Sequence, residues 1–224
     1  MRFSSNNRFS FKTNRKFEFR NFILESDILI DEFFVINKFE LINFFPNIKK
    51  NFHLSNHKLS IKYLEDDLYI DGKGDILIQD NKDTFKYSIN KKNDILDFKT
   101  SLKINNNPLK IKSLNYEDVN ALIQLEGSKN KKDEINIKDF IINEKKNRIR
   151  AQNIKFNKKF EIVKLGTVNL NYTDQENQKN QIKFYPMKNK YVLKGSSFNA
   201  NSLIDDLLFE DKNSNFFNID TRIE

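Results

Sequence analysis

Residues 96–104, Leu-Asp-Phe-Lys-Thr-Ser-Leu-Lys-Ile, decide the fold, because every second residue is apolar except Thr100 and the residues between them are polar. Successive side chains of a β-strand point to opposite faces of a sheet. Leu96, Phe98, Leu102 and Ile104 would therefore share a dry face, and the intervening lysines a wet one. The stretch predicts a strand whose sheet is apolar on one side only.

The same alternation recurs along most of the chain. It is found in the segments 59–63, 68–78, 85–89, 109–111, 119–125, 135–137, 149–151, 168–172, 182–184 and 191–193. These segments return roughly every 10 to 15 residues, separated by Asn, Asp, Lys and Gly. Short turns at 90–93 and 129–133 predict antiparallel neighbours, since parallel strands need long crossovers. The fold class expected is mainly β, with one or two short helices.

Three stretches depart from this pattern. Residues 31–45 fit either a helix that ends before Pro46 or two short strands. Residues 201–209 predict a short helix with Leu203, Ile204, Leu207 and Leu208 on one side and Asn201 as its N-cap. Between residues 150 and 156 the apolar parity slips by one, which predicts a β-bulge at Gln152 or Asn153, or a turn.

Composition favours a thin sheet over a thick core. Of 224 residues, 38% are hydrophobic and 13% aromatic, nearly all Phe, so apolar residues are few but bulky. The net charge of +8 indicates mainly a solvated Lys-rich surface, with nucleic-acid binding and an anionic membrane surface as the functional alternatives. Basic and aromatic residues interleave best between Phe9 and Arg20, which also fits a strand with lysine stems along it. No nucleic-acid partner is expected.

No motif for chemistry emerges. The chain has no Cys, and its two histidines, His53 and His57, lie in a segment that we expect to be a loop. Asp71–Asp75 lacks the spacing of a phosphate-binding glycine loop, and the acidic pairs lack a partner motif. We therefore expect no catalytic residue, no cofactor and no metal, and a protein that is not an enzyme.

No segment has the 18 or more apolar residues of a membrane span, and no apolar stretch follows the basic N-terminus as in a signal peptide. An organelle transit peptide is the alternative interpretation of the Arg- and Ser-rich start. If the chain works in a cell envelope, we expect its export signal and anchor to lie outside these residues.

The C-terminal half carries a recognisable order of parts. These are Leu114-Asn115-Tyr116 before segment 119–125, segment 135–142, Asn147–Ala151 with Ile154–Phe156, segment 168–172, and Tyr191–Ala200 followed by the helix. The closing strand, its Gly195 and the leucine-rich helix resemble the element that ends repeats in AsmA-like envelope proteins of Gram-negative bacteria. The resemblance is closest to YhdP-type members and covers residues 58–224.

The resemblance implies a long curved antiparallel sheet that forms an open groove and conducts phospholipid between inner and outer membrane. Residues 58–224 would form the β-repeat, after a segment 1–57 of mixed strand and helix. The chain would act in the periplasm, as part of an inner-membrane-anchored protein whose anchor it lacks. The inner face, in contact with acyl chains, would carry Phe98, Leu102, Ile104, Ile123, Leu125, Leu170 and Tyr191. A structural or adhesive β-repeat with a filled core is the alternative.

Overall fold

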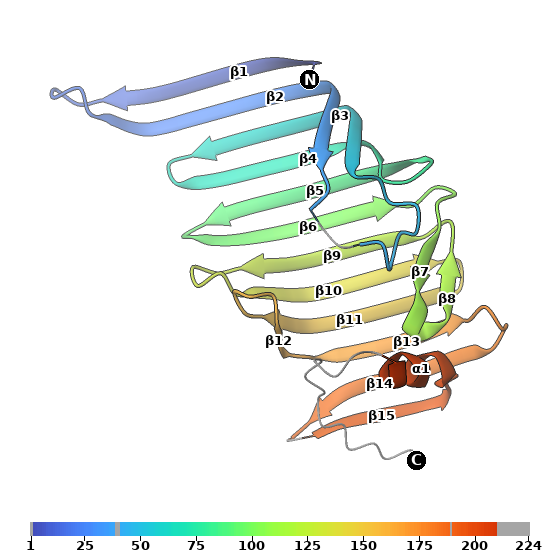
Figure 1. Ribbon diagram of the computed structural model, residues 1–224. Coiled ribbons are helices and arrows are strands. Elements are labelled where there is room, and N and C mark those ends of the chain that lie inside the picture. Colours follow the sequence, from blue (N-terminus) through green and yellow to red (C-terminus); the bar gives the residue numbers. More distant parts are fainter. Residues whose placement is uncertain (1, 39–40, 189, 210–224) are drawn as a thin grey trace.

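The computed structural model describes residues 2–38, 41–188 and 190–209. Within them, one large sheet, one two-stranded hairpin and one short α-helix make up the molecule (Figure 1). The elements are β1 (Arg2–Thr13), β2 (Phe19–Ile36), β3 (Asn51–Leu64), β4 (Asp67–Leu77), β5 (Lys82–Lys92), β6 (Ile95–Lys103), β7 (Leu109–Ile111), the 3-10 turn η1 (Lys112–Leu114), β8 (Tyr116–Asp118), β9 (Leu122–Lys129), β10 (Ile135–Glu144), β11 (Asn147–Phe156), β12 (Ile162–Lys164), β13 (Thr167–Thr173), β14 (Lys179–Met187), β15 (Lys190–Ser197) and α1 (Asn201–Phe209).

The described strands form a 13-stranded sheet in the order β1-β2-β3-β4-β5-β6-β9-β10-β11-β13-β14-β15, with β12 beside β11. Every pairing is antiparallel, and the sheet does not close on itself. The predicted mainly β class is therefore confirmed. The domain boundary expected between residues 57 and 58 falls inside β3. The strands β1 and β2 belong to the same sheet as the strands that follow it.

Cross-strand register places the apolar positions of neighbouring strands on one face. Phe98 of β6 pairs with Ile89 of β5 on one side and with Gly127 of β9 on the other. Directly paired residues point the same way, so this face, here called the apolar face, continues from strand to strand. The opposite, polar face carries the lysines, serines and aspartates that alternate with these positions.

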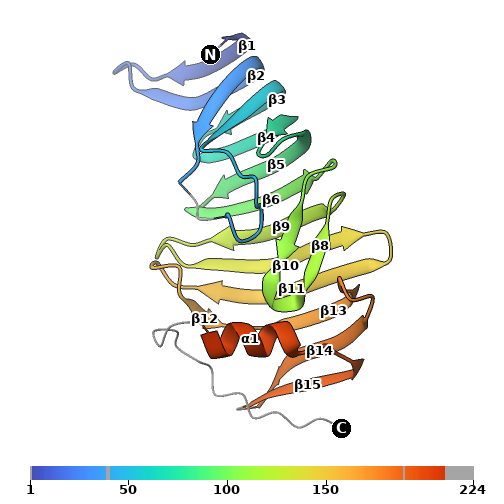
Figure 2. The same cartoon turned by 45° about the vertical axis from the view of Figure 1, so that its right-hand side comes forward.

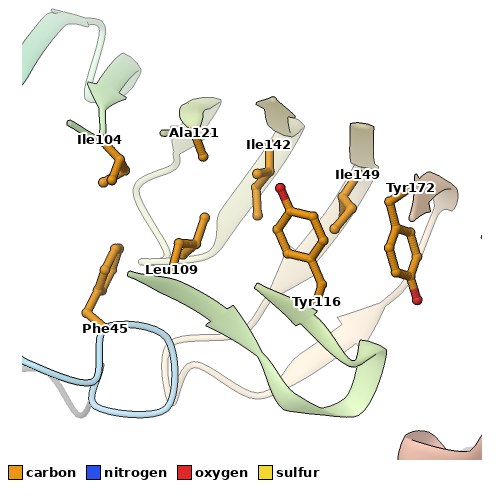
Figure 3. Close-up of a cluster of buried hydrophobic side chains, with 8 residues drawn as sticks. All are labelled: Phe45, Ile104, Leu109, Tyr116, Ala121, Ile142, Ile149 and Tyr172. Carbon is orange, nitrogen blue, oxygen red and sulfur yellow. The ribbon is translucent and has the colours of Figure 1, made fainter. Parts of the chain in front are cut away.

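One end of the apolar face is covered. The cover, here called the cap, consists of residues 41–50, the segment 105–120 with the β7–β8 hairpin, and α1 (Figure 2). Between cap and sheet lies a cluster of buried side chains: Phe45, Leu109 and Tyr116 from the cap, and Ile104, Ala121, Ile142, Ile149 and Tyr172 from the sheet end (Figure 3). Among the described residues, the buried apolar cluster thus lies at this end of the sheet.

Buried amides hold the cap to the sheet. The Asn107 side chain is fully buried, donates to the carbonyl of Asn81 at 2.8 Å and to Asp83 Oδ1 at 2.9 Å, and accepts from the Asn81 amide at 2.9 Å. Gln79, also fully buried, donates to the Pro108 carbonyl at 2.9 Å. Buried polar groups are tolerated only when bonded, so these residues fix the β4–β5 turn against residues 105–108.

The stretches that departed from strand periodicity adopt different structures. Residues 31–36 complete β2, and one helical turn follows, in which the Phe45 amide donates to the Leu41 carbonyl at 2.8 Å. The expected strand 119–125 begins only at Leu122, because residues 119–121 lead out of the cap. The shift at 150–156 is a confirmed irregularity: Asn153 has φ 56° within β11, so Ala151 and Ile154 share a face.

The helix at Asn201–Phe209 is confirmed over its predicted range. The expected N-cap, however, is wrong: Asn201 is itself the first helical residue, and the Asn199 side chain accepts from its amide at 3.2 Å. Leu203 is half-buried and Ile204 is exposed. The side chains of Leu207 and Leu208 lie outside the described residues.

Candidate functional site

The part of the apolar face away from the cap is the candidate site. Seven residues follow one another as direct cross-strand partners from β3 to β11, here called the isoleucine row: Ile61, Ile70, Ile89, Phe98, Gly127, Ile137 and Ile154. Five of them are half-buried, whereas Gly127 and Ile137 are buried. None of them belongs to the buried cluster beneath the cap or to the side chains packed against that cluster.

The dimensions of this row suit a lipid tail. Neighbouring strands are about 4.8 Å apart, so seven strands give an apolar path of roughly 29 Å. One leaflet of a bilayer core is about 15 Å thick. An extended acyl chain lying across the strands would thus be in contact with apolar side chains along its whole length.

A glycine keeps the row flat. A Cβ on Gly127 would lie 2.7 Å from Phe98 Cζ and 2.7 Å from the carbonyl oxygen of Asn136. The Phe98 ring therefore lies across the position where a neighbouring side chain would stand. Gly72 of β4 is overlaid by the Tyr87 ring in the same way. Gly72 and Gly74 both lie within β4, so Asp71–Asp75 is not a phosphate loop.

Beyond the isoleucine row, cations join the apolar face. The next row of cross-strand partners is Tyr63, Leu68, Lys91, Leu96, Lys129, Ile135 and Phe156. Lys91 is exposed, and Lys129 forms an ion pair of 2.7 Å with Asp133. Apolar side chains followed by lysines toward the turns are the pattern that an amphiphile with an anionic headgroup requires.

The seven residues predicted for the inner face all lie on the apolar face, but in two environments. Phe98 and Leu125 lie in the uncovered part, and Tyr191 stacks on Phe184 at 4.7 Å near the β15 edge. Ile104 is 1% exposed within the core, and Leu102, Ile123 and Leu170 pack against that core. Ile104 is therefore unavailable to a ligand, because residues of the cap that the sequence pattern did not reveal cover it.

The histidines lie in a strand, which corrects the expected loop. His53 and His57 both belong to β3, where Asn56 with φ 51° shifts the register between them. His53 Nε2 is 3.1 Å from Glu32 Oε1. His57 is 1% exposed, and its Nε2 lies 3.2 Å from the Tyr87 hydroxyl. Burial lowers the pKa of His57 below its usual value.

This burial predicts a pH-dependent stability. The unfolded chain binds a proton at His57 near pH 6.5, whereas the folded chain resists it, so stability is lost as the pH falls below about 6.5. The slope should not exceed about 1.4 kcal/mol per pH unit. Urea unfolding of the protein and of His57→Gln at several pH values isolates this contribution as their difference. Parallel pH profiles for the two proteins would contradict it.

The polar face carries a feature that sequence reasoning missed. A trough of about 950 Å³ crosses the middle of β1–β6, between two columns of side chains that alternate with the apolar positions. Lys58, Lys73 and Lys86 are successive cross-strand partners along it, and none forms an ion pair with a described residue. Like charges directly opposite one another are unfavourable. The sequence did place these three lysines at polar positions of successive predicted strands, and that could have indicated a row of cations on the polar face.

The described residues offer neither a metal site nor a membrane-spanning helix. They contain no group of three or more His, Cys, Asp or Glu side chains arranged to hold a metal ion. None of their helices has both the length and the apolar character needed to cross a membrane.

Comparison with known proteins identifies no relative. No family model, no curated protein and no solved structure matches this chain. The resemblance to AsmA-like proteins therefore stays a prediction, and the function has to be argued from the sheet itself.

Proposed function

We propose that this chain is a non-enzymatic, lipid-binding segment of an envelope protein, and that phospholipid acyl chains lie on the uncovered part of its apolar face. The observation that carries the proposal is the isoleucine row: seven paired positions, six of them large and apolar, none of which belongs to the cluster beneath the cap. Burial of apolar chain is worth roughly 0.8 kcal/mol per CH₂ and needs no specific contact.

The position of the lysines supports phospholipid over a purely apolar ligand. Lys91 and Lys129 border the row on the side of the turns, where they would meet a phosphate while the tail extends over Phe98 and Ile89. In the AsmA-like context, such a segment would conduct phospholipid between inner and outer membrane from a periplasmic position. Its membrane contacts would then come through the full-length protein.

A structural or adhesive β-repeat is the second candidate function. The filled core favours it, because four of the seven predicted inner-face residues lie in or against that core. The two functions differ in one respect: a structural repeat needs no ligand on the isoleucine row.

Lipid retention tests the proposal. The protein is expressed in a bacterial periplasm and analysed by native mass spectrometry and lipid extraction, beside the variant Ile70→Asp/Ile89→Asp. Buried carboxylates disfavour an acyl chain, so we expect about tenfold less phospholipid in that variant. The control Ser88→Asp/Ser101→Asp adds the same charge to the polar face and should retain lipid. A lipid-free, cooperatively unfolding wild-type protein would point to the structural repeat instead.

A further inference from the structure

Three turns at one end of the sheet share a sequence and a hydrogen-bonding pattern. They are Asn14–Glu18, Asn130–Glu134 and Asn157–Glu161, each with Asn, two basic residues, a variable fourth residue and Glu. In each turn the Asn Oδ1 accepts from the third amide at 2.9 Å and from the fifth at 3.1 Å. Its Nδ2 donates to the Glu carboxylate at 2.6–2.8 Å. These bonds fix the turn without help from the fourth side chain.

The fourth residue of each turn is left-handed, with φ of 59° at Phe17, 61° at Asp133 and 62° at Phe160. Asp and Asn adopt this conformation readily, whereas a bulky residue there is an outlier. The turn therefore favours Asp or Asn at this position. Asp133 is one example, and Asn177, in a similar turn at the opposite end of the sheet, is another. Phe17 and Phe160 go against that preference.

Packing does not account for the two phenylalanines. Phe17 is 82% and Phe160 is 74% exposed, the highest values among the exposed large apolar side chains described. Each follows a pair of cations, Arg15-Lys16 and Lys158-Lys159. None of these four cations forms an ion pair with a described residue.

Both turns lie at the same end of the sheet. The register that joins β1 to β11 brings the β1–β2, β3–β4, β5–β6, β9–β10, β11–β12 and β14–β15 connections to one side, here called the turn edge and seen at the left of Figure 1. About half of the exposed large apolar side chains lie there: Phe9, Phe11, Phe17, Phe22, Leu64, Ile95, Phe160, Ile162, Val163 and Met187. Lys91 and Lys129 border the same edge.

Exposed aromatics next to lysines and arginines are the chemistry of a membrane–water interface. Phenylalanine, like tryptophan and leucine, buries at the boundary between headgroups and acyl chains when a protein lies on a membrane, and basic side chains are attracted to anionic lipid. A turn fixed by its own hydrogen bonds can present a ring to that interface without rearrangement of the sheet.

We propose that the turn edge docks on an anionic phospholipid bilayer, with Phe17 and Phe160 inserted among the headgroups and the adjacent cations against the phosphates. The docking extends the proposed function, since acyl chains on the isoleucine row would meet the membrane at this edge. It does not depend on lipid conduction and is tested separately.

The test is cosedimentation with vesicles of phosphatidylglycerol and phosphatidylethanolamine, and with vesicles of phosphatidylcholine alone. The wild-type protein should bind the anionic vesicles preferentially. The variant Phe17→Asn/Phe160→Asn should bind them at least about tenfold more weakly, while its Tm stays equal or rises because Asn suits the left-handed position. Asp133→Asn removes the carboxylate that pairs with Lys129, so it should bind anionic vesicles at least as well as wild type. Asp133→Phe removes the same charge and adds a third ring, so it should bind more strongly than Asp133→Asn, its charge-matched control.

Several outcomes would overturn the docking. They are equal binding of Phe17→Asn/Phe160→Asn and wild type, failure of wild type to bind anionic vesicles, and binding of a single-stranded oligonucleotide instead, lost in the phenylalanine variant. Lipid retention distinguishes this failure from that of the proposed function. Phe17→Asn/Phe160→Asn should retain the copurified lipid, whereas Ile70→Asp/Ile89→Asp should lose that lipid and still bind vesicles.

Discussion

Replacing Tyr172 by alanine is expected to lower the free energy of unfolding by about 3–5 kcal/mol. Tyr172 is 2% exposed, and its ring meets that of Tyr116 edge-on at a centroid distance of 5.7 Å. Its hydroxyl donates to the Leu114 carbonyl at 2.8 Å. Burial raises the pKa of Tyr172, so the hydroxyl remains a donor throughout the physiological range. Alanine would remove the side chain that joins β13 to the β7–β8 hairpin.

Urea unfolding measures this cost, with Tyr172→Phe as the control. Phenylalanine keeps the ring contact and loses only the hydrogen bond, so it should cost about 1 kcal/mol. Hydrogen exchange should show the amides of residues 109–118 less protected in the alanine variant. If alanine and phenylalanine cost the same, ring packing at the cap is not what stabilises this end of the sheet.

Replacing Asn107 by alanine is expected to cost about 2–5 kcal/mol, because the change leaves several buried groups without their partner. The amide and carbonyl of Asn81 lose their bonds, and Asp83 keeps only the one from the Asn105 amide, at 2.9 Å. Burial already raises the pKa of Asp83, against the hydrogen bonds that lower it. The measurement is again equilibrium unfolding in urea.

Asn107→Asp tests the same network through its charge. It would place two buried carboxyl groups side by side, and like charges at that distance raise the pKa of one of them. A raised pKa gives stability that is present at low pH and lost as the pH rises, so this variant should be weakest near neutral pH and regain stability toward about pH 5. A pH-independent loss would mean that the amide acts by shape alone.

Alternation predicted the sheet well because each strand carries its own signal. The pattern from Leu96 to Ile104 fixes both the existence of β6 and the side it turns to the apolar face. The helix at Asn201–Phe209 likewise shows its leucine spacing locally. The shift at Asn153 was predictable because a change of parity inside an apolar segment has few structural causes.

The cap escaped prediction for a physical reason. The segment 109–111 was expected to be a strand and forms β7, but its alternation did not indicate that it leaves the large sheet to pair with Tyr116–Asp118, a strand of only three residues. What holds the cap down is a set of asparagine and glutamine side chains far apart in sequence, and a buried Asn107 looks like any loop Asn. As a result, Leu102, Ile123 and Leu170 were expected beside lipid but pack against a filled core.

The turn edge shows the opposite case. Its three repeated turns share the sequence Asn-basic-basic-X-Glu, yet of the three only the one at 129–133 was predicted to be a hairpin turn. The strand register brings these turns, which lie more than a hundred residues apart in the sequence, to one end of the sheet. The sequence alone does not show that they are neighbours. Exposure then separates Phe17 and Phe160 from ordinary turn residues.

Site-specific photocrosslinking tests the central claim most directly. A photoreactive phenylalanine analogue replaces Phe98 on the isoleucine row or Lys99, its neighbour in sequence, which lines the polar trough. Expressed in cells with radiolabelled phospholipid and irradiated, the protein should acquire label at position 98 and little at position 99. Equal labelling at both positions, or label at position 99 alone, would contradict an acyl-binding apolar face.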